Sequence, residues 1–134
     1  MDHLDILVLL VEDSHEIQTG MAAMLKDSGA TIIAAMTTEE AKRLFLKSSR
    51  RFDLIVVDGC VDTHRTEEPD TIELIQWFRD QGYTGLMVAW ASNPHHRQQQ
   101  LKAGCNVELE KFCLPRYVEH AFCTPITPIP PPPC

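Results

Sequence analysis

The stretch "VLLVEDSHEI", residues 8–17, places a buried-type strand directly before two acids. Four apolar residues, Val8 to Val11, lead into Glu12 and Asp13. A short continuous apolar run is typical of a strand that is covered on both faces, as in a parallel sheet. The tip of this strand therefore carries two adjacent negative charges, and their position needs a chemical explanation.

The whole chain has the size and composition of one globular domain. Its 134 residues are enough to bury a substantial core. The formal net charge of -7 disfavours general attraction to nucleic-acid phosphates or anionic membranes, so a cation is the more natural small partner. No apolar run reaches the length of a membrane span, and no signal peptide is recognisable, so we expect a cytoplasmic protein. The five cysteines lack zinc-ligand spacing, so we expect reduced thiols.

Strand-like and helix-like segments alternate along the chain. The predicted strands cover residues 4–11, 31–35, 52–58, 85–91 and 107–109. A helix is predicted after each strand from amphipathic spacing and from signals at helix ends, namely the capping patterns Thr37-x-x-Glu40 and Asp70-x-x-Glu73, Pro94, Gly29 and Gly104. This alternation predicts an α/β fold, with a doubly wound five-stranded parallel sheet and five helices in a single domain.

The domain is expected to cover residues 1–122. The remaining residues, 123–134, include "TPITPIPPPPC", which cannot continue a helix. We expect this segment to form an extended proline-rich tail or linker.

Acids end two of the predicted strands. Glu12 and Asp13 follow the first strand, and Asp58 ends the third, "FDLIVVD". In a doubly wound sheet, sites form at the carboxyl ends of strands near the point where strand order reverses, so these acids can share a pocket. Crowded carboxylates repel unless some are protonated or a cation neutralises them, and Mg²⁺ suits such oxygen ligands. Lys111, after the fifth strand, can reach the same pocket; the alternative is that all four residues are solvated loop groups.

These segments together resemble the receiver domain of two-component response regulators. The resemblance covers essentially residues 4–122 and rests on "LLVEDSHEI", "FDLIVVDG", "GYTGLMVAWAS" and "LKAGCNVELEK". It implies a flavodoxin-like fold in which an aspartate receives a phosphoryl group from the phosphohistidine of a histidine kinase. It also implies a signalling switch and not an enzyme.

Matched residue by residue, the resemblance makes Asp58 the phosphoacceptor. Asp13 would bind Mg²⁺ directly and Glu12 mostly through water, with the backbone carbonyl of Cys60 as a further ligand. Lys111 would contact the phosphoryl group. The residue types suit this chemistry, because a carboxylate is the nucleophile while a metal and an ammonium neutralise the charge of the transferring group.

Two positions depart from the pattern of the family. The family usually has Thr or Ser at the end of the fourth strand, where this chain has Ala91 followed by Ser92; either Ser92 substitutes or the switch is weakened. The usual aromatic switch residue falls three positions before Lys111, where this chain has Glu108. The usual hydroxyl–aromatic coupling is therefore expected to be absent. The runner-up interpretation is a pseudo-receiver, an interaction module with weak or no switching.

Other polar and aromatic residues have simpler expected roles. His95 and His96 are interpreted as polar helix surface, and Trp90 as a core residue. The segment "DTHRTEEPD", which includes His64, is interpreted as a solvated acidic loop, with a second metal site as the alternative.

The expected partners follow from the resemblance. They are a histidine kinase or phosphotransfer protein, and a downstream protein or covalently linked domain, with no direct role for nucleic acid or membrane. The output and a homodimer contact are expected on the face of the fourth helix, fifth strand and fifth helix. A third interpretation, a Mg²⁺-dependent phosphohydrolase with Asp58 as nucleophile, is disfavoured because Cys60 stands where such enzymes commonly place a second acid.

Overall fold

The computed structural model describes residues 5–62 and 67–123. Residues 124–134 of the predicted proline-rich tail and His64 of the acidic loop lie outside the described residues, while Cys123, the first residue of the predicted tail, belongs to the last helix. Within the described part, no helix combines the length and the apolar character that a membrane span requires.

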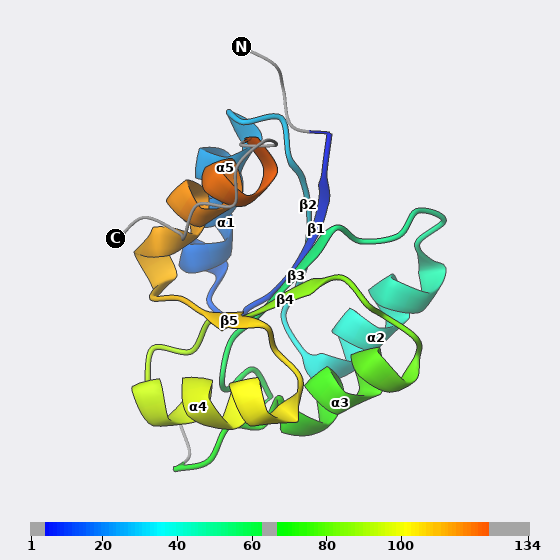
Figure 1. Ribbon diagram of the computed structural model, residues 1–134, viewed down its shortest axis with the longest axis vertical. Helices are drawn as coiled ribbons and strands as arrows, with labels where there is room; N and C mark the ends of the chain where they lie inside the picture. Colours follow the sequence, from blue (N-terminus) through cyan, green and yellow to red (C-terminus); the bar gives the residue numbers. More distant parts are fainter. Residues whose placement is uncertain (1–4, 63–66, 124–134) are drawn as a thin grey trace.

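Five parallel strands form one sheet in the order β2-β1-β3-β4-β5. The strands are β1 (Leu7–Val11), β2 (Thr31–Ala35), β3 (Leu54–Val57), β4 (Leu86–Ala89) and β5 (Val107–Glu108). The helices are α1 (His15–Lys26), α2 (Thr38–Lys47), α3 (Ile72–Asp80), α4 (Pro94–Ala103) and α5 (Leu114–Cys123), and α5 follows a short 3₁₀ turn, η1 (Lys111–Cys113). Helices α1 and α5 cover one face of the sheet, and α2, α3 and α4 cover the other (Figure 1). This arrangement confirms the predicted flavodoxin-like α/β fold.

The strands are buried on both faces, as the apolar runs predict. In β1, Leu7, Leu9 and Val11 join the core beneath α2 and α3, together with Phe52 and Phe78 from the surrounding chain. The intervening residues of β1 join the core beneath α1 and α5, with the other members Met21, Leu25 and Trp90. Burial of Trp90 confirms its predicted place in the core. Because successive side chains of a strand point to opposite faces, one apolar run supplies two cores.

The predicted helix starts are confirmed where a side chain caps the first turn. The hydroxyl of Thr37 accepts a hydrogen bond from the Glu40 N–H at 3.1 Å. Ser14 caps α1 through the Ile17 N–H at 3.3 Å, and Asn93 caps α4 just before Pro94. Such side chains satisfy backbone donors that have no partner inside the helix.

The predicted cap at Asp70 is wrong. The residue before α3 is Thr71, and neither it nor Asp70 caps the helix through its side chain. The carboxylate of Asp70 instead accepts hydrogen bonds from the N–H groups of Val61 and Asp62 at 2.9 and 3.0 Å. A carboxylate that binds a preceding loop is not available to the helix, and sequence spacing does not distinguish these alternatives.

Two other expectations need correction. His95 is exposed as predicted, but His96 is buried, and its Nε2 lies 2.9 Å from the carbonyl oxygen of Glu67. The reason is that α4 packs against α3 and the chain after β3, so one polar face of α4 is covered. The expectation of reduced thiols is wrong for Cys113, which is disulfide-bonded, whereas Cys105 is a free thiol. Cysteine number and spacing alone do not fix pairing, which depends on distances in the folded chain.

Candidate functional site

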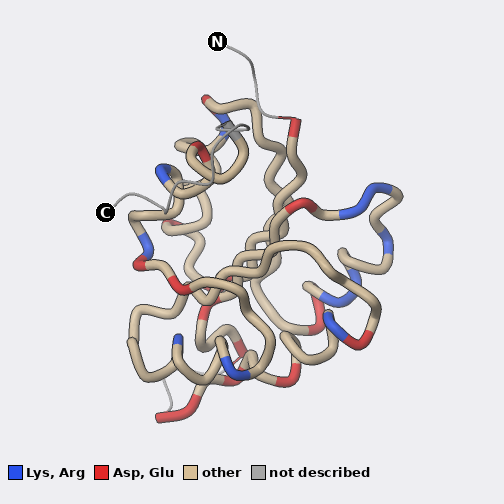
Figure 2. Tube along the Cα trace, in the orientation of Figure 1, with Lys and Arg blue, Asp and Glu red and all other residues tan. Residues whose placement is uncertain are grey.

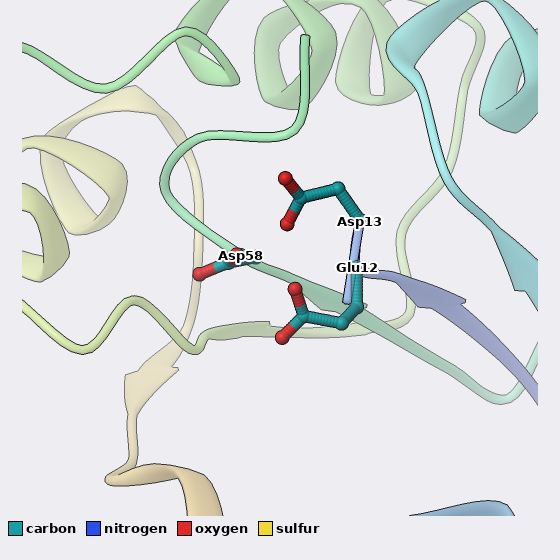
Figure 3. A group of neighbouring side chains, drawn as sticks. All are labelled: Glu12, Asp13 and Asp58. Atoms are coloured by element: carbon teal, nitrogen blue, oxygen red, sulfur yellow. The ribbon is translucent and has the colours of Figure 1, made fainter. Parts of the chain in front are cut away.

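The three predicted acids meet at the carboxyl ends of β1 and β3. These strands are neighbours in the sheet, and the Asp58 N–H continues their pairing by donating to the Val11 carbonyl at 3.0 Å. Oxygen atoms of Glu12, Asp13 and Asp58 all lie within 4.8 Å of one another. Their carboxylates face a common space (Figure 3). The site lies where strand order reverses, which is the usual position for ligands in a doubly wound sheet.

Lys111 also lies in this cluster. Its Nζ is 2.5 Å from Glu12 Oε1 and 2.9 Å from Asp58 Oδ1. The lysine side chain is only 10% exposed, and the Asp58 side chain 13%, so these ion pairs are largely shielded from solvent. The clustered basic residues of the α2–β3 loop lie elsewhere on the molecule (Figure 2). Within residues 5–62 and 67–123, only Lys111 forms an ion pair with these acids.

Trp90 fixes the position of Lys111. The indole Nε1 donates a hydrogen bond to the Lys111 carbonyl oxygen at 3.1 Å. The lysine Nζ lies 4.2 Å from the centroid of the same ring, a cation–π distance. The tryptophan therefore contacts both the main chain and the ammonium of Lys111. The predicted core position of Trp90 did not include this role.

The charge balance of the cluster favours a cation. The pKa of Glu12 is raised to about 7, mainly because burial penalises the charged form; the ammonium of Lys111 acts in the opposite direction, and the neighbouring Asp58 adds to the increase. Among the described residues, Asp13 has no ion-pair partner, so one lysine faces three acids. Carboxylate oxygens with room for water are the ligands that Mg²⁺ prefers, so the residues present fit this ion.

The first position that departs from the receiver pattern, Ala91, lies beside the chain that follows Asp58. Ala91 is buried and Ser92 is exposed. A Cβ atom added to Gly59 would lie 2.8 Å from Ala91 Cβ and 2.9 Å from His96 Nδ1, so the chain after Asp58 packs closely against this segment. The structure thus places Ala91 next to the cluster but gives no contact between Ser92 and the three acids.

Glu108 is held by polar groups of α4. The Nε atom of Arg97 donates to Glu108 Oε1 at 3.0 Å, and Gln98 Nε2 donates to Oε2 at 2.7 Å. Arg97 also donates to the carbonyl oxygens of Ala91 at 2.8 Å and Ser92 at 3.3 Å. A guanidinium therefore connects β5 to the β4–α4 junction, where the family pattern leads one to expect a hydroxyl and an aromatic ring.

Two further polar residues support Asp58 and were missed in the sequence. Thr71 Oγ1 donates to the Asp58 carbonyl at 2.7 Å, and Gln100 Nε2 donates to the same carbonyl at 2.9 Å. One signal was available, because His96, Arg97 and Gln100 recur at helical spacing. Nothing in the local pattern indicates that this polar face is covered. For Cys60, the structure gives a contact between Sγ and the Glu68 carbonyl at 3.8 Å; the ligand role of its own carbonyl stays a prediction.

Comparison with known proteins gives matches by structure alone. No family model and no curated protein sequence matches the chain. A two-component response regulator from Clostridium difficile superposes with a TM-score of 0.74 at 16% identity, covering 92% of this chain and 100% of that one. A response regulator receiver protein from Pseudoalteromonas atlantica gives 0.71 at 15% identity, covering 85% and 94%. A chemotaxis protein from Vibrio cholerae gives 0.69 at 21% identity, covering 86% and 97%.

The solved structures and the strand order agree with the resemblance seen in the sequence. Parallel order β2-β1-β3-β4-β5, five covering helices and acids at the carboxyl ends of β1 and β3 occur together in one domain. The chain therefore has the fold of a response regulator receiver domain.

Proposed function

We propose that this chain is a phosphoacceptor receiver domain that signals by phosphorylation of Asp58. The observation that carries the proposal is the cluster of Glu12, Asp13 and Asp58 with Lys111 at the carboxyl ends of the central strands. Solvated loop acids need neither burial nor a shared lysine. The cluster is therefore better explained by a functional site at the strand ends than by a chance grouping of loop acids.

Asp58 would act as the nucleophile. Its Oδ1 accepts from the Gly59 N–H at 2.7 Å and pairs with Lys111. Its Oδ2 has no partner among the described residues, so we assign the attack to this oxygen. A new oxygen–phosphorus bond forms to Oδ2, the phosphorus–nitrogen bond of a phosphohistidine breaks, and the histidine nitrogen keeps the electron pair. Lys111 would then shift from the carboxylates towards the phosphoryl oxygens.

The acids would hold Mg²⁺. Asp13 and Asp58 would bind the ion directly, Glu12 mostly through water, and the Cys60 carbonyl would be a further ligand. The ion would supply positive charge beside the phosphoryl oxygens as negative charge redistributes during transfer. Lys111 alone leaves the three acids with an excess of negative charge, which supports a cation as part of the functional site.

The partners would be proteins. The phosphoryl donor would be a histidine kinase or phosphotransfer protein, and the output would pass to a downstream protein or a linked domain in the cytoplasm. The similar solved structures are described as response regulators and receiver domains, which supports a signalling module in place of a turnover enzyme. The face of α4, β5 and α5 would serve output or homodimerisation.

A second form of the proposal, a pseudo-receiver with weak switching, has its own support. Ala91 cannot donate a side-chain hydrogen bond to a phosphoryl group, and Glu108 is fixed by Arg97 and Gln98. Acceptance of a phosphoryl group and propagation of the signal are therefore separate questions for this chain.

Phosphorylation can be tested directly. The protein is incubated with Mg²⁺ and acetyl phosphate, and intact mass is measured over time. We expect one phosphoryl adduct in the wild type, and none with Asp58→Asn or with a chelator of Mg²⁺. Asp80→Asn is the matched control, because Asp80 is an exposed aspartate at the end of α3, and it should form the adduct. Failure of the wild type to form an Asp58-dependent adduct would refute the proposal.

A further inference from the structure

The carbonyl group of Asp58 is bound by two fully buried polar side chains, one immediately before α3 and one in α4. Thr71, immediately before α3, donates its hydroxyl to this carbonyl at 2.7 Å. Gln100 of α4 donates Nε2 to the same carbonyl at 2.9 Å and to the Val57 carbonyl at 2.9 Å. The main chain of the candidate phosphoacceptor is thus attached to α3 and α4 by hydrogen bonds, in addition to the sheet.

The direction of the Gln100 amide is determined by its surroundings. Its Nε2 faces two carbonyl oxygens and the Thr71 hydroxyl oxygen at 3.2 Å, and the reversed amide would place Oε1 against the two carbonyls. Oε1 is buried without a hydrogen-bond partner among the described residues. A buried polar group that is not fully satisfied costs stability, so its presence here needs a reason beyond packing.

Thr71 shows the same preference for the Asp58 carbonyl over local structure. It occupies the N-cap position of α3, where a threonine hydroxyl ordinarily accepts from the first turn. In this protein, the hydroxyl makes no capping bond and donates to the carbonyls of Asp58 at 2.7 Å and Gly59 at 3.2 Å. Helix α3 therefore lacks a side-chain cap, whereas the main chain of Asp58 gains a hydrogen bond.

Helix α4 is also joined to the segment where the usual switch pair is missing. Arg97, one turn before Gln100, binds the Ala91 carbonyl and the Glu108 carboxylate. The same helix therefore contacts the Asp58 main chain at one point and β4 and β5 at another. A displacement of α4 would therefore change the contacts at both points.

We propose that Gln100 and Thr71 are positioning residues that transmit changes at Asp58 to α4 and α3. The inference rests on the proposed function, since it assigns the route by which phosphorylation would be detected. Hydrogen bonds weaken steeply when their geometry is distorted, so a movement of the Asp58 peptide must move the two helices or break these bonds. This route needs no hydroxyl at residue 91 and no aromatic ring at residue 108.

The test compares amide NMR spectra of the wild type and variants with Mg²⁺ alone and with Mg²⁺ plus beryllofluoride, a phosphoryl analogue. Gln100→Met keeps the length of the side chain and removes the amide. Thr71→Val keeps the shape and removes the hydroxyl, while Thr71→Ser restores it. Gln99→Met is the matched control, because this half-buried neighbour makes no side-chain hydrogen bond in the described residues.

In the wild type and in Gln99→Met, we expect shifts around Asp58 to extend into α4, residues 94–103. In Gln100→Met, the shifts around Asp58 should remain while those in α4 are lost. Thr71→Val should lose the shifts in α3, residues 72–80, and Thr71→Ser should recover them. If Gln100→Met does not fold, as judged by circular dichroism, the two Thr71 variants carry the test.

The outcomes separate this inference from the proposed function. A beryllofluoride adduct at Asp58 with unchanged α4 shifts in Gln100→Met overturns the inference and leaves the proposed function standing. If the wild type forms no adduct, the proposed function fails. The inference is then tested by the spectra recorded with Mg²⁺ alone. Shifts in α4 that depend on Mg²⁺ and on Gln100 then support it, and their absence in the wild type overturns it.

Discussion

Glu12 is a buried acid whose pKa is set by the surroundings of the site. It is almost completely buried, lies beside Asp58 and pairs with Lys111. Burial is the main reason that its pKa is raised from 4.5 to about 7, because a low-dielectric environment penalises the charged form. A residue kept for stability alone would not be an acid at this position, so its presence points to binding.

The raised pKa predicts a pH dependence of folding in the metal-free protein. Below pH 4.5, Glu12 is protonated in both the folded and the unfolded state. As pH rises to about 7, the unfolded chain releases this proton first, so the free energy of unfolding falls. The free energy of unfolding falls by a total on the order of 3 kcal/mol, and the decrease is complete above the pKa of Glu12 in the folded state.

The substitution Glu12→Gln should remove this pH-dependent part of the free energy of unfolding. Urea unfolding is measured in chelator from pH 4 to 8, and the wild-type curve is compared with the variant curve. The exposed Glu16→Gln on α1 is the control and should follow the wild type. An equal decline of stability with pH in Glu12→Gln would contradict the assignment of the pKa shift to Glu12.

At the scale of elements, α4 is unusual because its buried face is polar. His96, Arg97 and Gln100 lie inward, and each bonds to main-chain oxygens of neighbouring segments. An apolar helix would pack against the sheet without forming side-chain hydrogen bonds to loop carbonyls. The polar face of α4 instead fixes the helix to the carboxyl ends of β3 and β4, and Asp58 at the end of β3 belongs to the site.

Loss of Arg97 should therefore cost more than loss of its carboxylate partner. Arg97→Met leaves the Ala91 and Ser92 carbonyls without a donor, with an expected cost of about 1–3 kcal/mol in the free energy of unfolding. Glu108 is partly exposed, and Glu108→Gln should cost at most about 1 kcal/mol.

The comparison is made by urea unfolding at constant pH. Arg43→Met is the control, since this arginine is exposed on α2 and, among the described residues, pairs only with Glu40 three residues earlier in the helix. Its effect should be within measurement error. Equal destabilisation by Arg97→Met and Glu108→Gln would show that the ion pair, and not the carbonyl contacts, dominates at this junction.

At the scale of the whole molecule, strand order creates the site. Placing β1 between β2 and β3 brings the carboxyl ends of β1 and β3 together, although Glu12 and Asp58 are far apart in sequence. Lys111 reaches the same point from beyond β5. Residues from three distant parts of the chain therefore share one binding event, so a bound ion would stabilise the fold as a whole.

Mg²⁺ should raise the melting temperature. At an ion concentration about ten times the dissociation constant, the gain is about 1.4 kcal/mol, which corresponds to roughly 4 °C for a domain of this size. Asp13→Asn should abolish the increase, because it removes a proposed direct ligand without touching the Lys111 ion pairs. Asp80→Asn should retain it. A melting temperature that does not respond to Mg²⁺ in the wild type would contradict the metal site.

Much of this fold could be predicted from local patterns. The apolar runs predicted all five strands, with β2 matching at both ends, and the cap at Thr37 and the proline at residue 94 marked helix starts. Strand ends differed where the chain leaves the ladder, so the predicted 52–58 became Leu54–Val57. Asp70 and His96 were misjudged because their partners come from other segments.

The sequence by itself determined the alternation of strands and helices and the presence of acids and a lysine after particular strands, because these depend on periodicity and on local chemistry. Only the tertiary structure decided that Trp90 holds Lys111, that Arg97 fixes Glu108, and that Thr71 and Gln100 bind the Asp58 carbonyl. Each of these contacts joins residues from different elements, and its formation depends on distances and orientations that no local pattern contains.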